Sequence, residues 1–240
     1  MSVHADVLVV DDEQVVRGAV RKVCTAEGLV VDGAESVDAG LERLARMRYR
    51  AVLLDLMLPA SGGMRVLEAS RRDHPEIPVV MITGYATPES KVECFRGGAF
   101  DVLPKPFDAN ELVAVLRRAM GFAETPGEVP AEHKRAGLFT LGHHSWVRIE
   151  EDGTAALGVG GSFRRVLDGM TQIETPAIDG ELVQGKRMAV ITSRDGLGHR
   201  VWSPLGGTVV ATNRTCEEDR WLLRIVPTDL ENELEQLARM

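Results

Sequence analysis

The first half of the chain alternates short apolar segments with longer segments of helical periodicity. Each apolar segment has the length of a strand, and the residues that follow it place apolar side chains three and four positions apart, as one face of a helix requires. The expected strands cover residues 7–10, 29–31, 52–55, 77–83 and 100–103. Strands that are apolar on both faces and separated by helices predict a doubly wound, five-stranded parallel sheet with helices on both sides.

Polar side chains stand where these strands end. Asp55 closes the third strand, Asp11 and Asp12 follow the first, Thr83 ends the fourth and Lys105 follows the fifth. Ends of parallel strands meet at one edge of the sheet, where such folds bind ligands. Neighbouring carboxylates repel one another unless a cation lies among them, and carboxylate oxygens suit Mg²⁺. This edge therefore predicts a magnesium site at which Asp55 accepts a phosphoryl group, stabilised by Thr83 and Lys105.

Four short motifs sharpen this prediction. They read Val-Asp-Asp-Glu at 10–13, Asp-Leu-Met-Leu-Pro at 55–59, Ile-Thr-Gly at 82–84 and Pro-Lys-Pro-Phe at 104–107. In this order they resemble the two-component response-regulator receiver domain, over roughly the first half of the chain. The resemblance implies a flavodoxin-like fold and a histidine kinase as the phosphate donor.

The same resemblance implies a set of site residues. Asp55 is the phosphoacceptor, and Mg²⁺ is held by Asp12, Asp55 and the backbone carbonyl of Met57, with Asp11 in support. A cis peptide bond is expected between Lys105 and the proline after it. Receivers usually carry an aromatic residue three positions before this lysine, but the chain has Val102 there. Whether this replacement weakens switching stays open at the level of the sequence.

A change in composition divides the chain. Residues 123–137 are rich in proline, glycine and acidic residues and contain little that could be buried, which is typical of a linker. We therefore expect one domain at 1–122, a linker at 123–137 and a second domain at 138–240. The second domain shows short apolar segments separated by turn residues, which favours an antiparallel β-barrel or sandwich. These segments are residues 146–149, 155–159, 170–174, 188–192, 201–202, 209–212 and 221–226.

The second half resembles the glycine-cleavage H protein, a lipoyl-bearing barrel-sandwich hybrid. The similarity rests on His-Ser-Trp-Val-Arg at 144–148, Asp-Gly-Thr at 152–154, Trp-Ser-Pro at 202–204 and Trp-Leu-Leu at 221–223. That family carries lipoate on a hairpin lysine eight residues before the proline of the second tryptophan motif. Gly196 occupies this position here, and Lys186 is the lysine of residues 138–240. We therefore expect no lipoate.

A hairpin without lipoate could serve another purpose. Its residues Arg194, Asp195 and His199 are charged or polar and follow one another closely around Gly196. We expect them to form a surface that binds a protein partner, since electrostatic groups of this kind favour specificity.

Charge and composition exclude other classes of partner. The net charge is −8, and the only clusters of basic residues are pairs such as Arg71-Arg72 and Arg117-Arg118 rather than one basic face, so no nucleic acid is expected as a partner. No apolar run approaches the length of a membrane span and the N-terminus lacks the pattern of a signal peptide, so we expect no membrane partner and a cytoplasmic location.

The interpretation that follows is a response regulator of a two-component phosphorelay with a non-lipoylated, protein-binding output domain. It is not an enzyme, apart from the receiver's own phosphoryl transfer and dephosphorylation. Three alternatives stay open: a transcription regulator, a lipoyl-type carrier controlled by the receiver, and a phosphate sink with an inert second domain. The kinase, its signal, the output partner and the oligomeric state are also open, including a homodimer through the receiver.

Overall fold

A computed structural model describes residues 5–59, 62–124, 137–165, 167, 169–213 and 221–239. They form two compact units. The first contains the described residues up to Ala86 and those from Gly97 to Glu124, and the second contains Thr87–Arg96 and those from Gly137 onward. Most of the predicted linker, 125–136, lies outside the described residues. One short segment, Thr87–Arg96, thus belongs to the second unit although it lies within the first half of the sequence.

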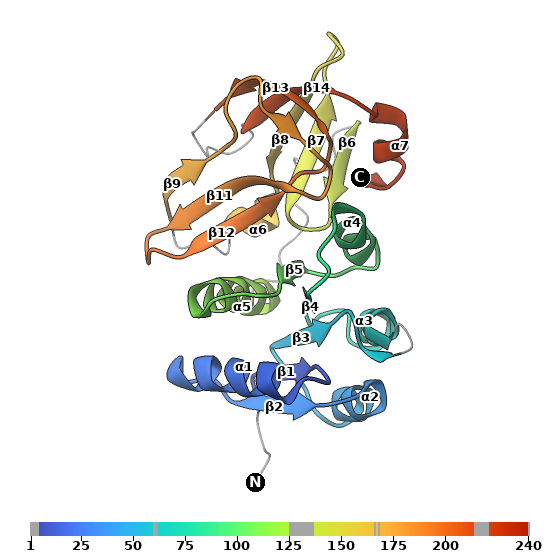
Figure 1. Cartoon of the computed structure of the whole chain (residues 1–240), viewed down its shortest axis with the longest axis vertical. Helices are drawn as coiled ribbons and strands as arrows, with labels where there is room; N and C mark the ends of the chain where they lie inside the picture. The colour runs from blue at the N-terminus through green and yellow to red at the C-terminus, as the bar shows by residue number, and fades with distance from the viewer. Residues whose placement is uncertain are drawn as a thin grey trace. The chain divides into compact units, whose positions relative to one another are not determined.

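The first unit is a parallel sheet between two layers of helices. Its strands run in the order β2-β1-β3-β4-β5, and every neighbouring pair is parallel. Helices α1 and α5 cover one face, and α2 and α3 cover the other (Figure 1). The elements are β1 (Val7–Val10), α1 (Gln14–Ala26), β2 (Val31–Ala34), α2 (Val37–Arg46), β3 (Ala51–Asp55), α3 (Gly62–Asp73), β4 (Val79–Thr83), β5 (Asp101–Pro104) and α5 (Ala109–Glu124). The predicted doubly wound fold is confirmed.

Local side-chain hydrogen bonds explain where helices α2 and α5 begin. The Ser36 hydroxyl accepts the Ala39 N–H at 3.3 Å and caps α2. At the start of α5, the Glu111 N–H donates to Asp108 at 2.9 Å and the Asp108 N–H donates to Glu111 at 3.2 Å, which forms a reciprocal capping box.

Among the described residues, no helix combines the length and the apolar character needed to cross a membrane.

The second unit is mainly antiparallel β-structure. One sheet has the strand order β10-β13-β14-β8-β7-β6-β15, and a smaller one has the order β12-β11-β9. The elements are α4 (Pro88–Arg96), β6 (Leu138–Leu141), β7 (Ser145–Ile149), β8 (Ala155–Val159), α6 (Gly161–Arg165), β9 (Met170–Glu174), β10 (Glu181–Leu182), β11 (Arg187–Ser193), β12 (Gly198–Trp202), β13 (Gly207–Thr212), β14 (Leu223–Pro227), α7 (Leu230–Leu234) and β15 (Ala238–Arg239). This arrangement is consistent with the expected barrel-sandwich hybrid.

The core of the second unit joins both sheets. Val147 and Leu157 from the larger sheet and Ile191 and Val201 from the smaller one are fully buried and belong to one cluster. Strands β8 and β9 have the predicted bounds, whereas β6 and β15 were not predicted. β15 pairs with β6 although the two strands lie at opposite ends of the domain sequence, so local periodicity could not indicate their pairing.

A glycine at the start of α3 allows the helix to approach the end of β3. A Cβ atom at Gly63 would lie 2.4 Å from the carbonyl oxygen of Asp55 and 2.7 Å from the backbone of Leu56. These neighbours are backbone atoms, which cannot turn aside as a flexible side chain can. Any larger residue at this position must therefore displace the strand end that carries Asp55.

We expect Gly63→Ala to lower the free energy of unfolding by about 1–3 kcal/mol, because the added methyl overpacks against the backbone. Gly18, inside α1, is a matched control, since a Cβ there meets nothing within 4 Å. Gly18→Ala should raise stability by up to about 1 kcal/mol through its higher helix propensity. Urea denaturation of the full chain measures both, and equal midpoints for the two variants would contradict the packing argument.

Candidate functional site: the acidic edge of the parallel sheet

The ends of three strands bring the predicted site residues together. Asp11 follows β1, Asp55 is the last residue of β3, and Lys105 follows β5. Asp11 and Asp55 are 0% and 3% exposed, and Thr83 at the end of β4 is also buried. Backbone bonds fix the edge, because the Lys105 N–H donates to the Thr83 carbonyl at 2.7 Å. The structure therefore places the residues that the sequence predicted at one edge of the sheet.

The Lys105 ammonium connects three carboxylates. Its Nζ lies 2.9 Å from Asp11 Oδ2, 2.9 Å from Asp55 Oδ2 and 2.9 Å from Glu13 Oε1. Although burial by itself lowers the pKa of Lys105, the hydrogen bonds to Glu13, Asp11 and Asp55 raise it above its usual value. Burial raises the pKa of Asp11, and the hydrogen bond from Lys105 opposes that effect. The lysine is thus held in its charged form by the cluster.

Glu13 is a site residue that sequence reasoning missed. Its carboxylate is exposed, and its pKa is lowered by the hydrogen bond and the positive charge of Lys105. Its backbone N–H donates to Asp11 Oδ1 at 2.9 Å, so it also orients the neighbouring carboxylate. Its place in the Val-Asp-Asp-Glu motif was the available signal.

The carboxylates fit a divalent cation. Asp11, Asp12 and Asp55 each offer one oxygen, and these oxygens lie within 4.8 Å of one another. With Glu13 the cluster has four carboxylates, and the ammonium of Lys105 contacts three of them, so the cluster carries excess negative charge. Hard oxygen donors in this number suit Mg²⁺. The acidic pocket is thus typical of a Mg²⁺-binding receiver site, and the role of the Met57 carbonyl as a further ligand stays a prediction.

Both oxygens of Asp55 are engaged. Oδ1 accepts the Met57 N–H at 2.9 Å, and Oδ2 faces Lys105. Nearby, the Thr83 hydroxyl accepts the Tyr85 N–H at 3.0 Å. Val102, which replaces the usual aromatic residue, is 2% exposed and lies in β5 within the sheet. Because valine is short and β-branched, the Val102 side chain cannot alternate between inward and outward rotamers as an aromatic ring can.

The hairpin between β11 and β12 has a tip without an amine. Gly196 is exposed and has φ +83°, and Arg194 and Asp195 beside it are exposed as well. His199 differs from the expectation, because it is only 4% exposed and cannot form part of an open surface. Its Nε2 lies 2.9 Å from the Ser193 hydroxyl, which donates to Asp195 at 2.5 Å. His199 therefore supports the hairpin from beneath.

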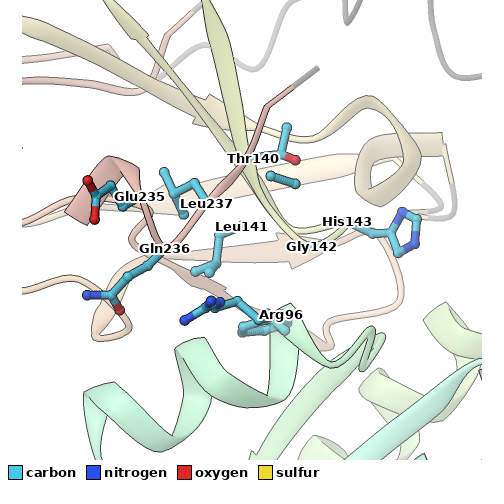
Figure 2. A pocket seen from close by; sticks show the side chains of 10 residues that line it. Arg96, Thr140, Leu141, Gly142, His143, Glu235, Gln236 and Leu237 are labelled. Carbon is cyan, nitrogen blue, oxygen red and sulfur yellow. The ribbon is translucent and has the colours of Figure 1, made fainter. Parts of the chain in front are cut away.

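The second unit also contains a cavity of about 470 Å³. Figure 2 shows Arg96 from α4, Leu141 from the end of β6 and Gln236 after α7 around it, while His143 points away from these three. Its volume is within the range of small-molecule pockets. None of the predicted site residues lines it.

The parallel order 2-1-3-4-5 and the acidic edge with its lysine are those of a receiver domain. Residues 7–117 match the response regulator receiver domain family, and residues 138–239 match the glycine cleavage H-protein family. The chain is thus a receiver domain of a two-component response regulator followed by an H-protein domain.

Several relatives share the first domain. Nitrogen assimilation regulatory protein NtrX of Azorhizobium caulinodans is 38% identical over 117 residues, which are 48% of this chain and 26% of that protein. DNA-binding transcriptional regulator NtrC of Escherichia coli K12 is 34% identical over 114 residues, 48% of this chain and 24% of that protein. The match thus spans about a quarter of the length of these relatives.

Solved structures give corresponding similarities. The receiver domain of NtrX from Brucella abortus is 39% identical, with a TM-score of 0.45, and the match covers 48% of this chain and 98% of that one. A CheY-like receiver domain from Methanospirillum hungatei JF-1 is 26% identical, with a TM-score of 0.49 and coverage of 51% and 98%.

We expect Mg²⁺ to stabilise the chain, by about 2.7 kcal/mol when its concentration is about a hundred times the dissociation constant. Asp12→Asn should lose most of this gain while changing the metal-free stability by less than about 0.5 kcal/mol, because Asp12 is exposed. Thermal midpoints with Mg²⁺ and with a chelator measure the effect. Glu151→Gln, an exposed carboxylate of the other unit, is the control, and an undiminished gain in Asp12→Asn would remove Asp12 from the site.

Proposed function

We propose that the chain is a cytoplasmic response regulator that takes a phosphoryl group from a histidine kinase onto Asp55 and acts through its H-protein domain by binding a protein. The observation that supports this most is the arrangement at Asp55, whose buried carboxylate faces Lys105 and lies beside Asp11 and Asp12. Phosphoryl transfer to a carboxylate requires positive charge around the nucleophile, which Lys105 supplies and which a Mg²⁺ ion bound by the acidic residues would add.

The chemistry follows from the contacts of Asp55. One carboxylate oxygen attacks the phosphorus atom of the donor, the bond from phosphorus to the imidazole nitrogen breaks, and the imidazole leaves with the electron pair and takes up a proton. Bound Mg²⁺, held by Asp12, Asp55 and the Met57 carbonyl, would supply positive charge to the phosphoryl oxygens. Lys105 then exchanges contacts with carboxylates for contacts with the phosphoryl group, and the Thr83 hydroxyl donates to it.

Hydrolysis of the acyl phosphate at the same site completes the cycle, and the domain catalyses no other reaction. Signal transmission is assigned to the loop that follows Thr83. On the neighbouring strand, Val102 packs inside the sheet opposite Met81 and replaces the aromatic residue that usually changes position in receivers. The packing of Val102 favours a response that stays near Thr83.

A DNA-binding role is less well supported. NtrC is named as a DNA-binding transcriptional regulator, but the similarity covers only 24% of that protein. The remaining half of this chain matches the H-protein family instead. A net charge of −8 disfavours a strong attraction to nucleic acid.

For the H-protein domain, the exposed tip of the β11–β12 hairpin supports a role without lipoate. Gly196 offers no amine for acylation, while Arg194 and Asp195 present opposite charges to solvent. Lys186, the lysine of the described part of this domain, lies on the turn before β11 rather than on the hairpin. We therefore assign protein binding to Arg194 and Asp195, with buried His199 holding the hairpin.

Phosphorylation is tested with a small phosphodonor and intact-mass measurement. Native protein should gain a phosphoryl-sized increment in the presence of Mg²⁺, and Asp55→Asn should gain none because its amide is not a nucleophile. Asp12→Asn should slow the reaction at least about tenfold through loss of a metal ligand. An increment that persists in Asp55→Asn, or in excess chelator, would place the acceptor elsewhere.

The hairpin assignment has two readouts. Co-expression with a lipoylating enzyme should leave the intact mass unchanged, because the tip carries no lysine. Affinity capture with the full chain should lose its specific partner in Arg194→Glu and keep it in Arg187→Glu, an exposed arginine at the other end of β11. A lipoyl-sized increment on Lys186 would restore a carrier role, and a partner retained by Arg194→Glu would exclude this surface.

A further inference from the structure

The cavity of the second unit is enclosed by three segments that are distant in the sequence (Figure 2). Its volume is about 470 Å³, and it is lined by the end of α4, by the end of β6 with the turn after it, and by residues 235–238 between α7 and β15. None of its described lining residues belongs to the acidic edge at Asp55 or to the hairpin tip at Gly196. The proposed function therefore leaves this cavity without a role.

Contacts between these segments hold the cavity in its shape. Gly142 has φ +55°, and a Cβ there would lie 2.8 Å from the Phe95 ring, so the turn after β6 packs directly on α4. The pairing of β15 with β6 fixes another wall. Helix α7 is anchored in turn, because the Gly206 N–H donates to the Glu233 carboxylate at 2.7 Å. The cavity is thus preformed, as ligand pockets usually are.

The inner wall of the cavity is apolar. Phe95 and Leu141 are 4% and 1% exposed, and Leu237 is partly buried and packs against the core of the second unit. The Phe95 ring contacts the His144 ring with centroids 5.1 Å apart, which limits its movement. A ligand that lies against this wall is stabilised by the burial of apolar surface.

Polar side chains line the same cavity. Arg96 is exposed at the end of α4 and Gln236 follows α7, and Figure 2 shows both near Leu141. Within the described ranges, neither side chain forms a hydrogen bond or an ion pair. Thr140 is only 5% exposed, yet its hydroxyl likewise bonds to no described residue. The guanidinium, amide and hydroxyl groups all carry donor hydrogens, so they favour a ligand that accepts hydrogen bonds.

One acidic side chain limits the charge of such a ligand. Glu235 also lines the cavity, is exposed and forms no ion pair in the part of the chain that the structure describes. The charges of Arg96 and Glu235 cancel. An anion with a single charge is attracted by Arg96, whereas a second negative charge on the same ligand is repelled by Glu235.

We propose that this cavity binds a small monocarboxylate with an apolar body, such as an arylalkanoate. The planar guanidinium of Arg96 donates two parallel hydrogen bonds to the carboxylate, which is the geometry that arginine and carboxylates share. The apolar body lies against Phe95 and Leu141. The site shares no residue with the acidic edge or the hairpin, so it does not depend on phosphorylation of Asp55.

Equilibrium dialysis of the full chain tests the site, with benzoate, phenylacetate and 3-phenylpropanoate as probes. A chelator is present, so that a metal ion does not bring the carboxylate to Asp55. Acetate keeps the charge but lacks the ring, and phenylacetamide keeps the ring but lacks the charge. Both should bind at least about tenfold more weakly than phenylacetate, since each loses one of the two interactions. The proposal is overturned if none of the three probes binds saturably, or if phenylacetamide binds as tightly as phenylacetate.

Variants locate the bound probe. Arg96→Met removes the charge but keeps a long side chain, and it should weaken phenylacetate binding at least about tenfold while leaving phenylacetamide binding unchanged. Glu235→Gln should strengthen phenylacetate binding, because a negative charge is removed from the lining. Arg187→Met, an exposed arginine outside the cavity, should bind as the native chain does. Undiminished phenylacetate binding by Arg96→Met would refute the proposal.

Discussion

The receiver depends on one lysine that satisfies carboxylates from separate strands. The Lys105 ammonium donates to Asp55 and Glu13 and forms an ion pair with Asp11. Two of these carboxylates are almost fully buried and would repel one another at the ends of β1 and β3 if no cation lay between them. The same contact that makes the edge of the sheet stable also places the cation beside the Asp55 oxygen that we propose as the phosphoryl acceptor. Under that proposal, stability and phosphoryl transfer depend on the same positive charge, and a substitution at Lys105 affects both.

Much of this receiver could be predicted from the sequence, because its signals are local. Apolar strands followed by amphipathic helices gave the order of elements, and strand ends gave the place of Asp55 and Thr83. The second strand was predicted at 29–31 but begins at Val31. The reason is local: Gly28 ends the helix region with φ +75°, and the carbonyl of Val30 is used by Asp6 and Val7 before the regular ladder starts. The hydrophobic periodicity of the sequence does not indicate where these backbone hydrogen bonds form, so it could not place the start of β2.

The less predictable features depend on tertiary contacts. Glu13 is an exposed acidic residue at the start of a helix, and only its contact with a lysine more than ninety positions away makes it part of the site. His199 follows the exposed tip of the hairpin, yet Phe163 packs against its ring with centroids 6.4 Å apart, and the side chain is buried. The pairing of β15 with β6 likewise joins segments that no short window contains.

The sequence match and the structural contacts assign the segment Thr87–Arg96 to different domains. By sequence, α4 belongs to the receiver family match, which runs from 7 to 117. By its contacts, it belongs to the second unit, so that unit is assembled from two separate stretches of chain. A gene fragment that starts at the linker would lack this helix and would uncover the ring of Trp202 and the wall of the cavity at Leu141. A substitution within Thr87–Arg96 would be assigned to the receiver by its position in the sequence, although its structural effect would be on the second unit.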